Sequence, residues 1–583
     1  MTRTLLHRTR TALVALLLPL CVAAACSSPG PYPDAPYGYG HHAVIPDLVF
    51  DGLDAAGSPT RIHLHDQYEP STTTSRLLVL RVGSGWCGTC DWHLRHTAEL
   101  FAPDIAASLS LLDLVVADDD NMPATLAFLP TYRARTDEAH ALGIDPQFQL
   151  GAAMTVHGPL PLVVLVDRRT MKIEDVLSNP DPDALKARLY AALDRLNGTS
   201  HAASASTDGP DGIHRNEWDL LRAMSLPTVP PPDPTNKKAD DPAAAALGRD
   251  LFSDKTLSPS STISCATCHD PTHAFVDGKP QAIGVSVGDR NAASVLLASH
   301  ARWQFWDGRA DSLWSQALGP LENPKESGSS RLFVAHAIFD RYKSAYQAIF
   351  GALPSLGETG RFPTSGMPGG ASWHAMTADD QRAVSVVFAN VGKSIAAFER
   401  SLRVSPNALD RYVAGDLGAL SDAQKQSLRS FLLIGCQQCH YGPRLTDDAF
   451  HVVRFPTGRQ DGTADPGRID GIPSLVASEF VGAGPFSDAP ESGRSFVGLA
   501  GGPSTAGAFK TPPLRGVADT APYGHGGSLL TLLDVAKNYG EAGLPDADAR
   551  AEGVSEPWLA KFTGGHAADF VPFLEVLTAA PVP

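Results

Sequence analysis

Two stretches of the chain, Cys265-Ala266-Thr267-Cys268-His269 and Cys436-Gln437-Gln438-Cys439-His440, share the pattern C-x-x-C-H. One turn of backbone brings two thiols together, so that they can form thioethers with the two vinyl groups of a haem, and the next residue points its imidazole at the iron. We therefore expect two covalently bound haem c groups, with His269 and His440 as proximal ligands. The alternatives are disulfides or a zinc site, and a zinc site would need both motifs to share one metal.

The remaining cysteines support redox chemistry rather than a disulfide framework. The chain has eight cysteines. Cys21 and Cys26 lie near the N-terminus, and the other six form three C-x-x-C pairs, of which the third is Cys87 and Cys90. Because no cysteine is left over, we expect each pair to serve a cofactor or a redox reaction.

The first 26 residues have the features of an export signal. Three arginines in the first ten residues precede an apolar run, 11–20, that is too short to span a membrane. The run ends in Ala23-Ala24-Ala25-Cys26, which resembles a bacterial lipobox. We expect a periplasmic protein whose Cys26 is lipidated, and Ser27 in place of Asp favours anchoring to the outer membrane. The alternative is ordinary cleavage, which would leave no anchor.

Length and charge limit the remaining possibilities. A chain of 583 residues needs several domains. Its net charge of -16 excludes nucleic acid as the expected partner, because phosphates require Lys and Arg. The acidic surface suits a basic redox partner or simply solubility.

The N-terminal third of the chain follows an α/β pattern. Short apolar strands are predicted at 76–82, 111–117 and 162–166, and helices at 91–109 and 184–196. Strands that alternate with helices indicate βαβ units around a covered sheet.

A third motif, Trp86-Cys87-Gly88-Thr89-Cys90, lies between the first of these strands and the following helix. This is the position of W-C-x-x-C in thioredoxins, which the N-terminal region therefore resembles, and Pro161 resembles their cis-proline. A helix N-terminus lowers the pKa of a thiol. The resemblance implies that the Cys87 thiolate attacks a disulfide of the substrate and that Cys90 resolves the mixed disulfide. The alternative is that Cys87 and Cys90 form a static disulfide. Its substrate cannot be predicted.

After a Pro-rich stretch, strand patterns nearly vanish and helices are predicted at 242–252, 383–398 and 421–434. We expect a multidomain fold, in which an α/β thioredoxin-like domain is followed by two mainly α-helical c-type cytochrome domains. The predicted parts are a signal peptide (1–26), a tether (27–43), the thioredoxin-like domain (44–197), a linker (198–240), an N-terminal peroxidatic cytochrome domain (241–417) and a C-terminal electron-transfer cytochrome domain (418–583).

The region from about 226 to 573 resembles the bacterial dihaem cytochrome c peroxidases and the related MauG-like oxidases. The resemblance rests on an ordered series of motifs: Leu247-Gly248-Arg249-Asp250-Leu251-Phe252, the first C-x-x-C-H, Arg290-Asn291, Phe305-Trp306-Asp307-Gly308-Arg309, Ala317-Leu318-Gly319-Pro320, Asn323-Pro324-Lys325-Glu326, the second C-x-x-C-H, Phe509-Lys510-Thr511-Pro512, and Ala521-Pro522-Tyr523-Gly524-His525-Gly526-Gly527.

The resemblance implies a peroxide site on the first haem. The family's catalytic Glu, Gln and Pro correspond to Glu326, Gln316 and Pro320. A carboxylate can move a proton between the peroxide oxygens, and an amide can orient the peroxide. Without the motif, Glu326 would be taken for a solvated loop residue. Trp306 corresponds to the tryptophan that relays electrons between the haems, and it is equally suited to a packed core.

The resemblance also implies a calcium site and the ligands of the second iron. Asn291, Thr520 and Pro522 correspond to residues around the family's inter-haem calcium ion. Peroxidases use a Met as sixth ligand of the second iron and the MauG branch uses a Tyr, and the corresponding residue here is Tyr539. The alternative is that Tyr539 is a buried aromatic and that a His is the ligand. A phenolate stabilises ferric iron, so the second haem should be harder to reduce.

Many of these peroxidases block the first iron with a His from a loop, but 276–290 contains no His. The first iron is therefore expected to be five-coordinate. The predicted activity is reduction of hydrogen peroxide with electrons from a small cytochrome or another periplasmic donor. The alternatives are a non-catalytic electron carrier or redox sensor with two six-coordinate irons, and a thiol–disulfide enzyme coupled to a dihaem module.

Overall fold

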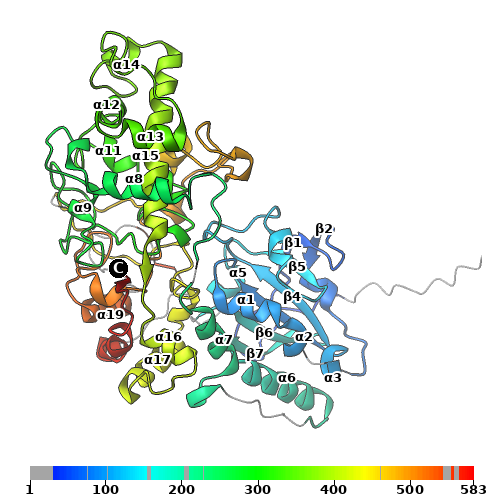
Figure 1. Cartoon of the computed structure of the whole chain (residues 1–583). Coiled ribbons are helices and arrows are strands. Elements are labelled where there is room, and N and C mark those ends of the chain that lie inside the picture. Colours follow the sequence, from blue (N-terminus) through cyan, green and yellow to red (C-terminus); the bar gives the residue numbers. More distant parts are fainter. Residues whose placement is uncertain are drawn as a thin grey trace, which may run out of the picture.

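The computed structural model describes residues 31–74, 76–101, 103–153, 159–201, 209–227, 229–459, 461–541, 553, 555–556 and 564–582. The expected signal peptide and the lipidation site Cys26 lie outside these residues. Figure 1 shows a domain built on a β-sheet beside an elongated helical part, in which helix α15 (Ala378–Ser401) runs through the upper lobe.

The N-terminal domain is a seven-stranded mixed sheet with the order β2-β1-β5-β4-β3-β6-β7. Its strands are β1 (Val49–Leu53), β2 (Pro59–His63), β3 (Leu77–Gly83), β4 (Leu109–Val115), β5 (Ala141–Ile144), β6 (Leu162–Asp167) and β7 (Lys172–Ser178). Its helices are η1 (Leu64–Gln67), α1 (Gly88–Arg95), α2 (Thr97–Leu100), α3 (Pro103–Ala106), α4 (Leu129–Arg133), α5 (Gln149–Ala153) and α6 (Pro182–Asn197).

The central strand β3 holds this sheet together. It pairs in parallel with β4 and antiparallel with β6, and all seven of its residues are buried. Because successive side chains of a strand point to opposite faces, Leu78 and Leu80 join the core that contains the dithiol, whereas Leu77 and Val79 pack with α6. The thioredoxin-like fold predicted for this region is confirmed.

The first cytochrome region is organised around two packed helices, α15 and α8 (Pro242–Ser253). A Cβ on Gly248 would lie 1.9 Å from the Ser394 carbonyl oxygen, so glycine is needed where α8 crosses α15. The other helices here are η3 (Lys255–Leu257), α9 (Cys265–Cys268), η4 (Ala298–His300), α10 (Leu313–Gln316), α11 (Gly319–Glu322), α12 (Arg331–Arg341), α13 (Lys343–Phe350) and α14 (Ala371–His374).

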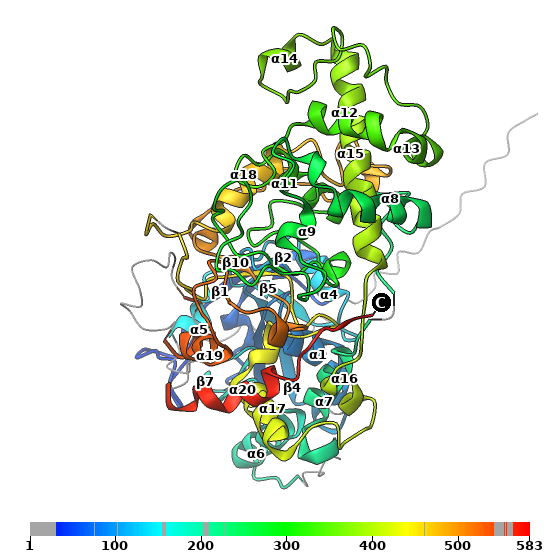
Figure 2. The same ribbon diagram turned by 60° about the vertical axis from the view of Figure 1, so that its left-hand side comes forward.

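The second cytochrome region is also mainly helical and is shown from another side in Figure 2. Its helices are α16 (Ala408–Val413), α17 (Asp422–Ile434), η5 (Cys436–Gln438), α18 (Arg468–Ala477), η6 (Pro490–Ser492), η7 (Pro503–Thr505), η8 (Val517–Asp519), α19 (Leu532–Glu541), η9 (Gly564–Phe570) and α20 (Val571–Leu574). Two small sheets join β9 (Phe450–His451) to β10 (Phe509–Lys510), and β8 (Arg403–Val404) to β11 (Pro581–Val582).

Two sequence-based expectations differ from the structure. The single helix predicted over 91–109 is wrong: the chain forms α1, α2 and α3 there, and β4 already begins at Leu109. The segment predicted as a linker contains η2 (Pro210–Gly212) and α7 (Arg215–Ala223). Leu221 of α7 is buried in one core with α16 and α17, because the amphipathic helix needs an apolar surface to cover its buried face.

Candidate functional site

The first attachment motif forms the short helix α9, which ends at His269. Its capping residue Ser264 accepts a backbone hydrogen bond and donates its own N–H to the Thr267 hydroxyl at 3.0 Å. The Nδ1 of His269 lies 3.3 Å from the carbonyl oxygen of Phe275. Since a carbonyl can only accept, Nδ1 carries the proton and Nε2 keeps its lone pair for a metal. Burial lowers the pKa of His269, which favours the neutral imidazole that binds iron.

The second motif repeats this arrangement. Gly435 ends α17 in the left-handed region (φ 91°), and the motif turns through η5 to His440. The Nδ1 of His440 lies 3.1 Å from the carbonyl oxygen of Leu445, and burial lowers the pKa of this histidine as well. Both motifs therefore hold a neutral histidine whose Nε2 is unprotonated.

Tyr539 of α19 lies on the far side of the second histidine. Its hydroxyl is 3.4 Å from Nε2 of His440. Histidine and tyrosine are both known ligands of haem iron, so this pair would suit the iron of the second haem. Burial raises the pKa of Tyr539, so that a phenolate would form only beside a cation.

The four motif cysteines suit haem rather than zinc or disulfides. Cys265, Cys268, Cys436 and Cys439 are free thiols. Among the described residues, the only group of three potential metal ligands is Cys439, Asp447 and His451, which does not include a residue of the first motif. The two motifs therefore do not form one shared zinc site.

A buried carboxyl group beside the first motif also fits a bound cofactor. Glu399 of α15 is 4% exposed, and burial raises its pKa to about 8. Its Oε2 has no hydrogen-bond partner among the described residues. An unpaired polar atom in such a place is expected to contact the occupant of the site. Sequence patterns gave no indication of this residue, which lies within a long helix.

Glu326 lies close to the first motif. Its backbone carbonyl accepts a hydrogen bond from the Val285 N–H at 2.9 Å, and the adjacent Ile283 carbonyl lies 3.9 Å from the Cys268 sulfur. The side-chain amide of Asn323 donates to Glu326 Oε1 at 2.6 Å. Burial raises the pKa of Glu326, although the cation of Arg309 and the Asn323 hydrogen bond oppose this shift.

The other residues predicted for the peroxide site lie on the two helices before Glu326. Pro320 is in α11, and its carbonyl accepts the N–H of Ser327 at 3.1 Å, which holds it next to the Glu326 segment. Gln316 is the last residue of α10 and is half-buried. The sequence analysis assigned no role to Arg309, although this residue belongs to the motif 305–309. Its guanidinium lies 3.6 Å from the centroid of the Phe305 ring.

Trp306 lies where the two cytochrome regions meet. Its indole N–H donates to the Asn291 carbonyl at 3.0 Å, and its own carbonyl accepts the Lys510 N–H at 2.8 Å. The Asn291 N–H donates to the His525 carbonyl at 2.8 Å. Asn291 is thus next to the segment that carries Thr520 and Pro522, the other residues of the expected calcium site.

Arg290 joins the two cytochrome regions through ion pairs with buried carboxylates. It contacts Asp307 of the first region at 2.5 Å and Asp465 of the second at 2.7 Å, and both carboxylates are buried. Despite the opposing effect of burial, hydrogen bonding and charge attraction from Arg290 lower the pKa of Asp465 to about 2. Arg290 and Asp465 are 175 residues apart, and the sequence did not indicate this ion pair.

The dithiol of the thioredoxin-like domain begins α1. Cys87 is the N-cap, and its sulfur accepts the Cys90 N–H at 3.1 Å. The two cysteines form a disulfide, and the bond between Leu160 and Pro161 is cis.

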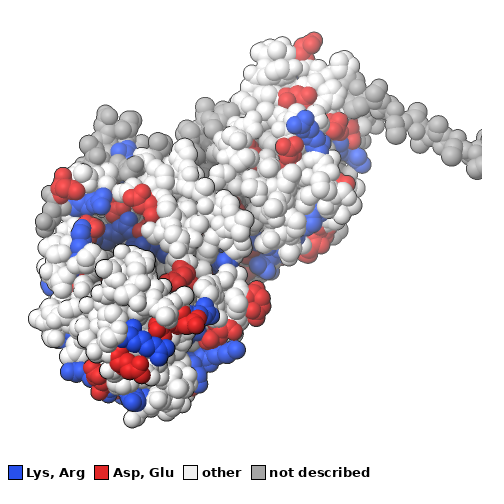
Figure 3. All heavy atoms as spheres, turned by 90° about the horizontal axis from the view of Figure 1, so that it is seen from above, with Lys and Arg blue, Asp and Glu red and all other residues white. Residues whose placement is uncertain are grey.

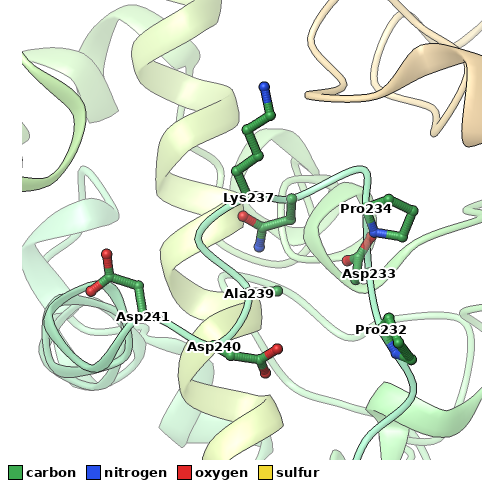
Figure 4. A pocket seen from close by; sticks show the side chains of 8 residues that line it. Pro232, Asp233, Pro234, Lys237, Ala239, Asp240 and Asp241 are labelled. Carbon is green, nitrogen blue, oxygen red and sulfur yellow. The ribbon is translucent and has the colours of Figure 1, made fainter.

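A separate pocket lies away from these motifs. It is lined by Pro232, Asp233, Pro234, Asn236, Lys237, Ala239, Asp240 and Asp241 (Figure 4). It contains none of the predicted site residues. On the face seen in Figure 3, basic and acidic side chains of the described residues are interspersed. None of the described helices combines the length and the apolar character needed to cross a bilayer.

Fold and site together define a two-domain c-type cytochrome with a thioredoxin-like domain. Residues 242–418 match the family described as di-haem cytochrome c peroxidase. The chain is 30% identical over 305 residues to the cytochrome c551 peroxidase of Pseudomonas aeruginosa, which covers 51% of this chain and 72% of that protein. It is 28% identical over 346 residues to the methylamine utilization protein MauG of Methylorubrum extorquens, covering 58% and 79%.

The chain therefore belongs to the dihaem cytochrome c peroxidase and MauG family, and it is a dihaem oxidoreductase. A structure described as a DsbE-type thiol:disulfide interchange protein from Chlorobium tepidum aligns with 27% of this chain and 99% of that chain, with 20% identity and a TM-score of 0.21.

The ion pairs of Arg290 with Asp307 and Asp465 allow a test of the contact between the two cytochrome regions. Arg290→Met leaves Asp307 and Asp465 buried with fewer partners, and we expect it to destabilise the protein by about 3 kcal/mol at pH 7, measured by thermal unfolding. The stabilisation by Arg290 is complete above pH 3.8, the ordinary pKa of Asp, and is lost as the pH falls toward the pKa of about 2 that Asp465 has in the folded protein. The loss of stability caused by Arg290→Met should therefore be smaller at pH 3 than at pH 7.

Lys325→Met is the control, because its ion pair with Asp289 is exposed and should contribute about 0–1 kcal/mol. Equal effects of the two substitutions at pH 7 would contradict the role assigned to Arg290.

Proposed function

We propose that the protein reduces hydrogen peroxide at the haem held by Cys265, Cys268 and His269, with Glu326 as the acid–base group. The overall reaction joins one H₂O₂, two electrons and two protons to give two waters. The haem supplies the redox centre at which peroxide is reduced. The observation that carries the proposal is the half-buried Glu326 carboxyl group, hydrogen-bonded to Asn323 beside this attachment motif.

Glu326 is suited to move a proton during this reaction. A general acid–base group works best when its pKa approaches the working pH, and burial shifts the pKa of Glu326 upward toward that range. The Asn323 amide fixes one carboxylate oxygen, which leaves the other for peroxide. Gln316 is proposed to orient the peroxide, and Pro320 to shape the open face.

Electrons are proposed to enter through the second haem, held by Cys436, Cys439 and His440, and to pass by Trp306. The hydrogen bonds of Trp306 to both cytochrome regions support this route. Tyr539 is the proposed sixth ligand of the second iron, which would keep the first iron as the open one.

The partners follow from the same proposal. A small cytochrome is the proposed electron donor, in line with the name of the Pseudomonas relative. Tyr539 also favours a second candidate, a MauG-like oxidation of a protein or organic substrate by peroxide. Calcium is proposed near Asn291, Thr520 and Pro522. We place the mature protein in the periplasm, bound to the outer membrane by a lipid on Cys26.

Replacement of Glu326 tests the proton-transfer role. We expect Glu326→Gln to slow the reaction with peroxide by about 10²–10⁴-fold, followed in the Soret band after rapid mixing. The rate of the wild-type protein should fall as the pH drops through the raised pKa of Glu326. The rate of the Glu326→Gln variant should not show this fall at low pH. Glu358→Gln, at an exposed loop position, is the control, and equal rates for the Glu326 and Glu358 variants would rule out the assignment.

Replacement of Tyr539 tests the ligand of the second iron. A thioether raises the haem potential relative to a phenolate, within the roughly 0.8 V that axial ligands span. Tyr539→Met should therefore make the second haem easier to reduce in a potentiometric titration, and Tyr539→Phe should produce a second high-spin ferric signal. An unchanged potential and spin state in both variants would show that another residue is the ligand.

A further inference from the structure

The dithiol of the thioredoxin-like domain is enclosed rather than presented to solvent. Cys87 is 0% and Cys90 is 2% exposed. The surface that covers them comes from the second cytochrome region, and specifically from the residues around its haem attachment motif. An external protein disulfide cannot reach Cys87 while this surface is in place.

Three contacts place the second motif across the dithiol face. A Cβ on Gly88, between the two cysteines, would lie 2.7 Å from the ring of Tyr441, which follows His440 directly. The side-chain amide of Gln438 donates a hydrogen bond to the Leu160 carbonyl, immediately before the cis-proline. At the other end of the motif, a Cβ on Gly435 would lie 2.7 Å from Pro159. The segment 435–441 therefore spans both α1 and the cis-proline loop.

The apolar core of the thioredoxin-like domain extends this contact to a motif cysteine. Cys439 packs against the cluster that contains Cys87 and Cys90. The ring of Trp86 lies edge-on to that of His451 at 4.7 Å, and His451 offers a ring nitrogen within 4.8 Å of the Cys439 sulfur. In contrast, Cys265 of the first motif packs against the core around α8 and α15. The dithiol is thus next to one attachment motif and away from the other.

Haem attachment has a redox requirement that this arrangement can meet. Two free thiols must add to the vinyl groups. In an oxidising compartment, a C-x-x-C pair readily closes to a disulfide, which cannot form thioethers. A nearby thiolate can reopen such a disulfide by exchange.

We propose that the thioredoxin-like domain is an intramolecular reductase for the second haem attachment motif. The Cys87 thiolate attacks a Cys436–Cys439 disulfide at the Cys439 sulfur, which forms a Cys87–Cys439 mixed disulfide and releases Cys436 as a thiolate that takes up a proton. Cys90 then attacks Cys87, which closes the Cys87–Cys90 disulfide and releases Cys439. Two electrons and two protons pass from the reduced Cys87–Cys90 dithiol, in the thiol state in which the chain is synthesised, to the motif disulfide, so one dithiol per chain serves one motif once.

This inference concerns how the second haem is attached, and it does not depend on the reaction proposed for the first haem.

Haem occupancy of the two motifs gives the direct test. The full chain is exported in a bacterial host that attaches haem c but has no thiol reductase of its own in the periplasm. Peptides with residues 265–269 and 436–440 are then examined by mass spectrometry for bound haem. In the Cys87→Ser/Cys90→Ser variant we expect haem to be lost from the second motif and kept at the first, and a small thiol added to the medium should restore it.

Arg188→Ala removes an exposed side chain of α6 from its ion pair with the buried Asp175, so it is the control for general damage to the domain and should load both motifs. Full loading of the second motif in the double variant would overturn the proposal. Loss that the added thiol does not restore would also overturn it, because the domain would then have only a structural role.

A trapped intermediate provides a second measurement. In Cys90→Ser, made without haem, Cys87 should remain joined to Cys439, and the cross-linked peptide should be found after digestion under non-reducing conditions. A cross-link to Cys265 or Cys268, or no cross-link, would contradict the proposed pairing.

Discussion

In both attachment motifs, a hydrogen bond from histidine Nδ1 to a backbone carbonyl sets the rest of the site. The carbonyls of Phe275 and Leu445 follow their histidines by six and five residues, so each histidine finds its hydrogen-bond acceptor within a short loop. This bond leaves Nε2 of each imidazole unprotonated. Burial lowers the pKa of both histidines and favours the neutral form, in which Nε2 can bind a metal.

The two sites differ in the side chains that lie near the attachment motif, and this difference underlies the proposed division of roles. The second site has the Tyr539 hydroxyl within 3.4 Å of His440 Nε2. The first site has a carboxyl group, Glu326, attached to a loop beside its cysteines. Arg290 and Trp306 hold the two regions in register through buried charges and backbone hydrogen bonds, so that the sites keep a fixed relation. The thioredoxin-like domain adds a redox-active cysteine pair, and the second attachment motif, not the first, lies against its active face.

Several helices and strands could be predicted from local sequence. The contacts between residues far apart in the chain could not be predicted, for physical reasons. Strand β3 and helices α8 and α17 have strong apolar periodicity or clear caps, and they lie close to their predicted positions. The strands β1, β2, β5 and β7 were not predicted, because they are short or carry polar residues. The Arg290–Asp465 pair, the unpaired Glu399 and the covering of Cys87 depend on residues far apart in the chain, and only the three-dimensional fold brings them together.

The central claim is that the chain holds two covalent haems, of which one iron has an open coordination position and the other does not. Electron paramagnetic resonance of the oxidised full-length protein, together with its haem content, tests this most directly. The account predicts one high-spin ferric signal and one low-spin ferric signal of equal intensity. Two low-spin signals, or a protein without covalent haem, would contradict it.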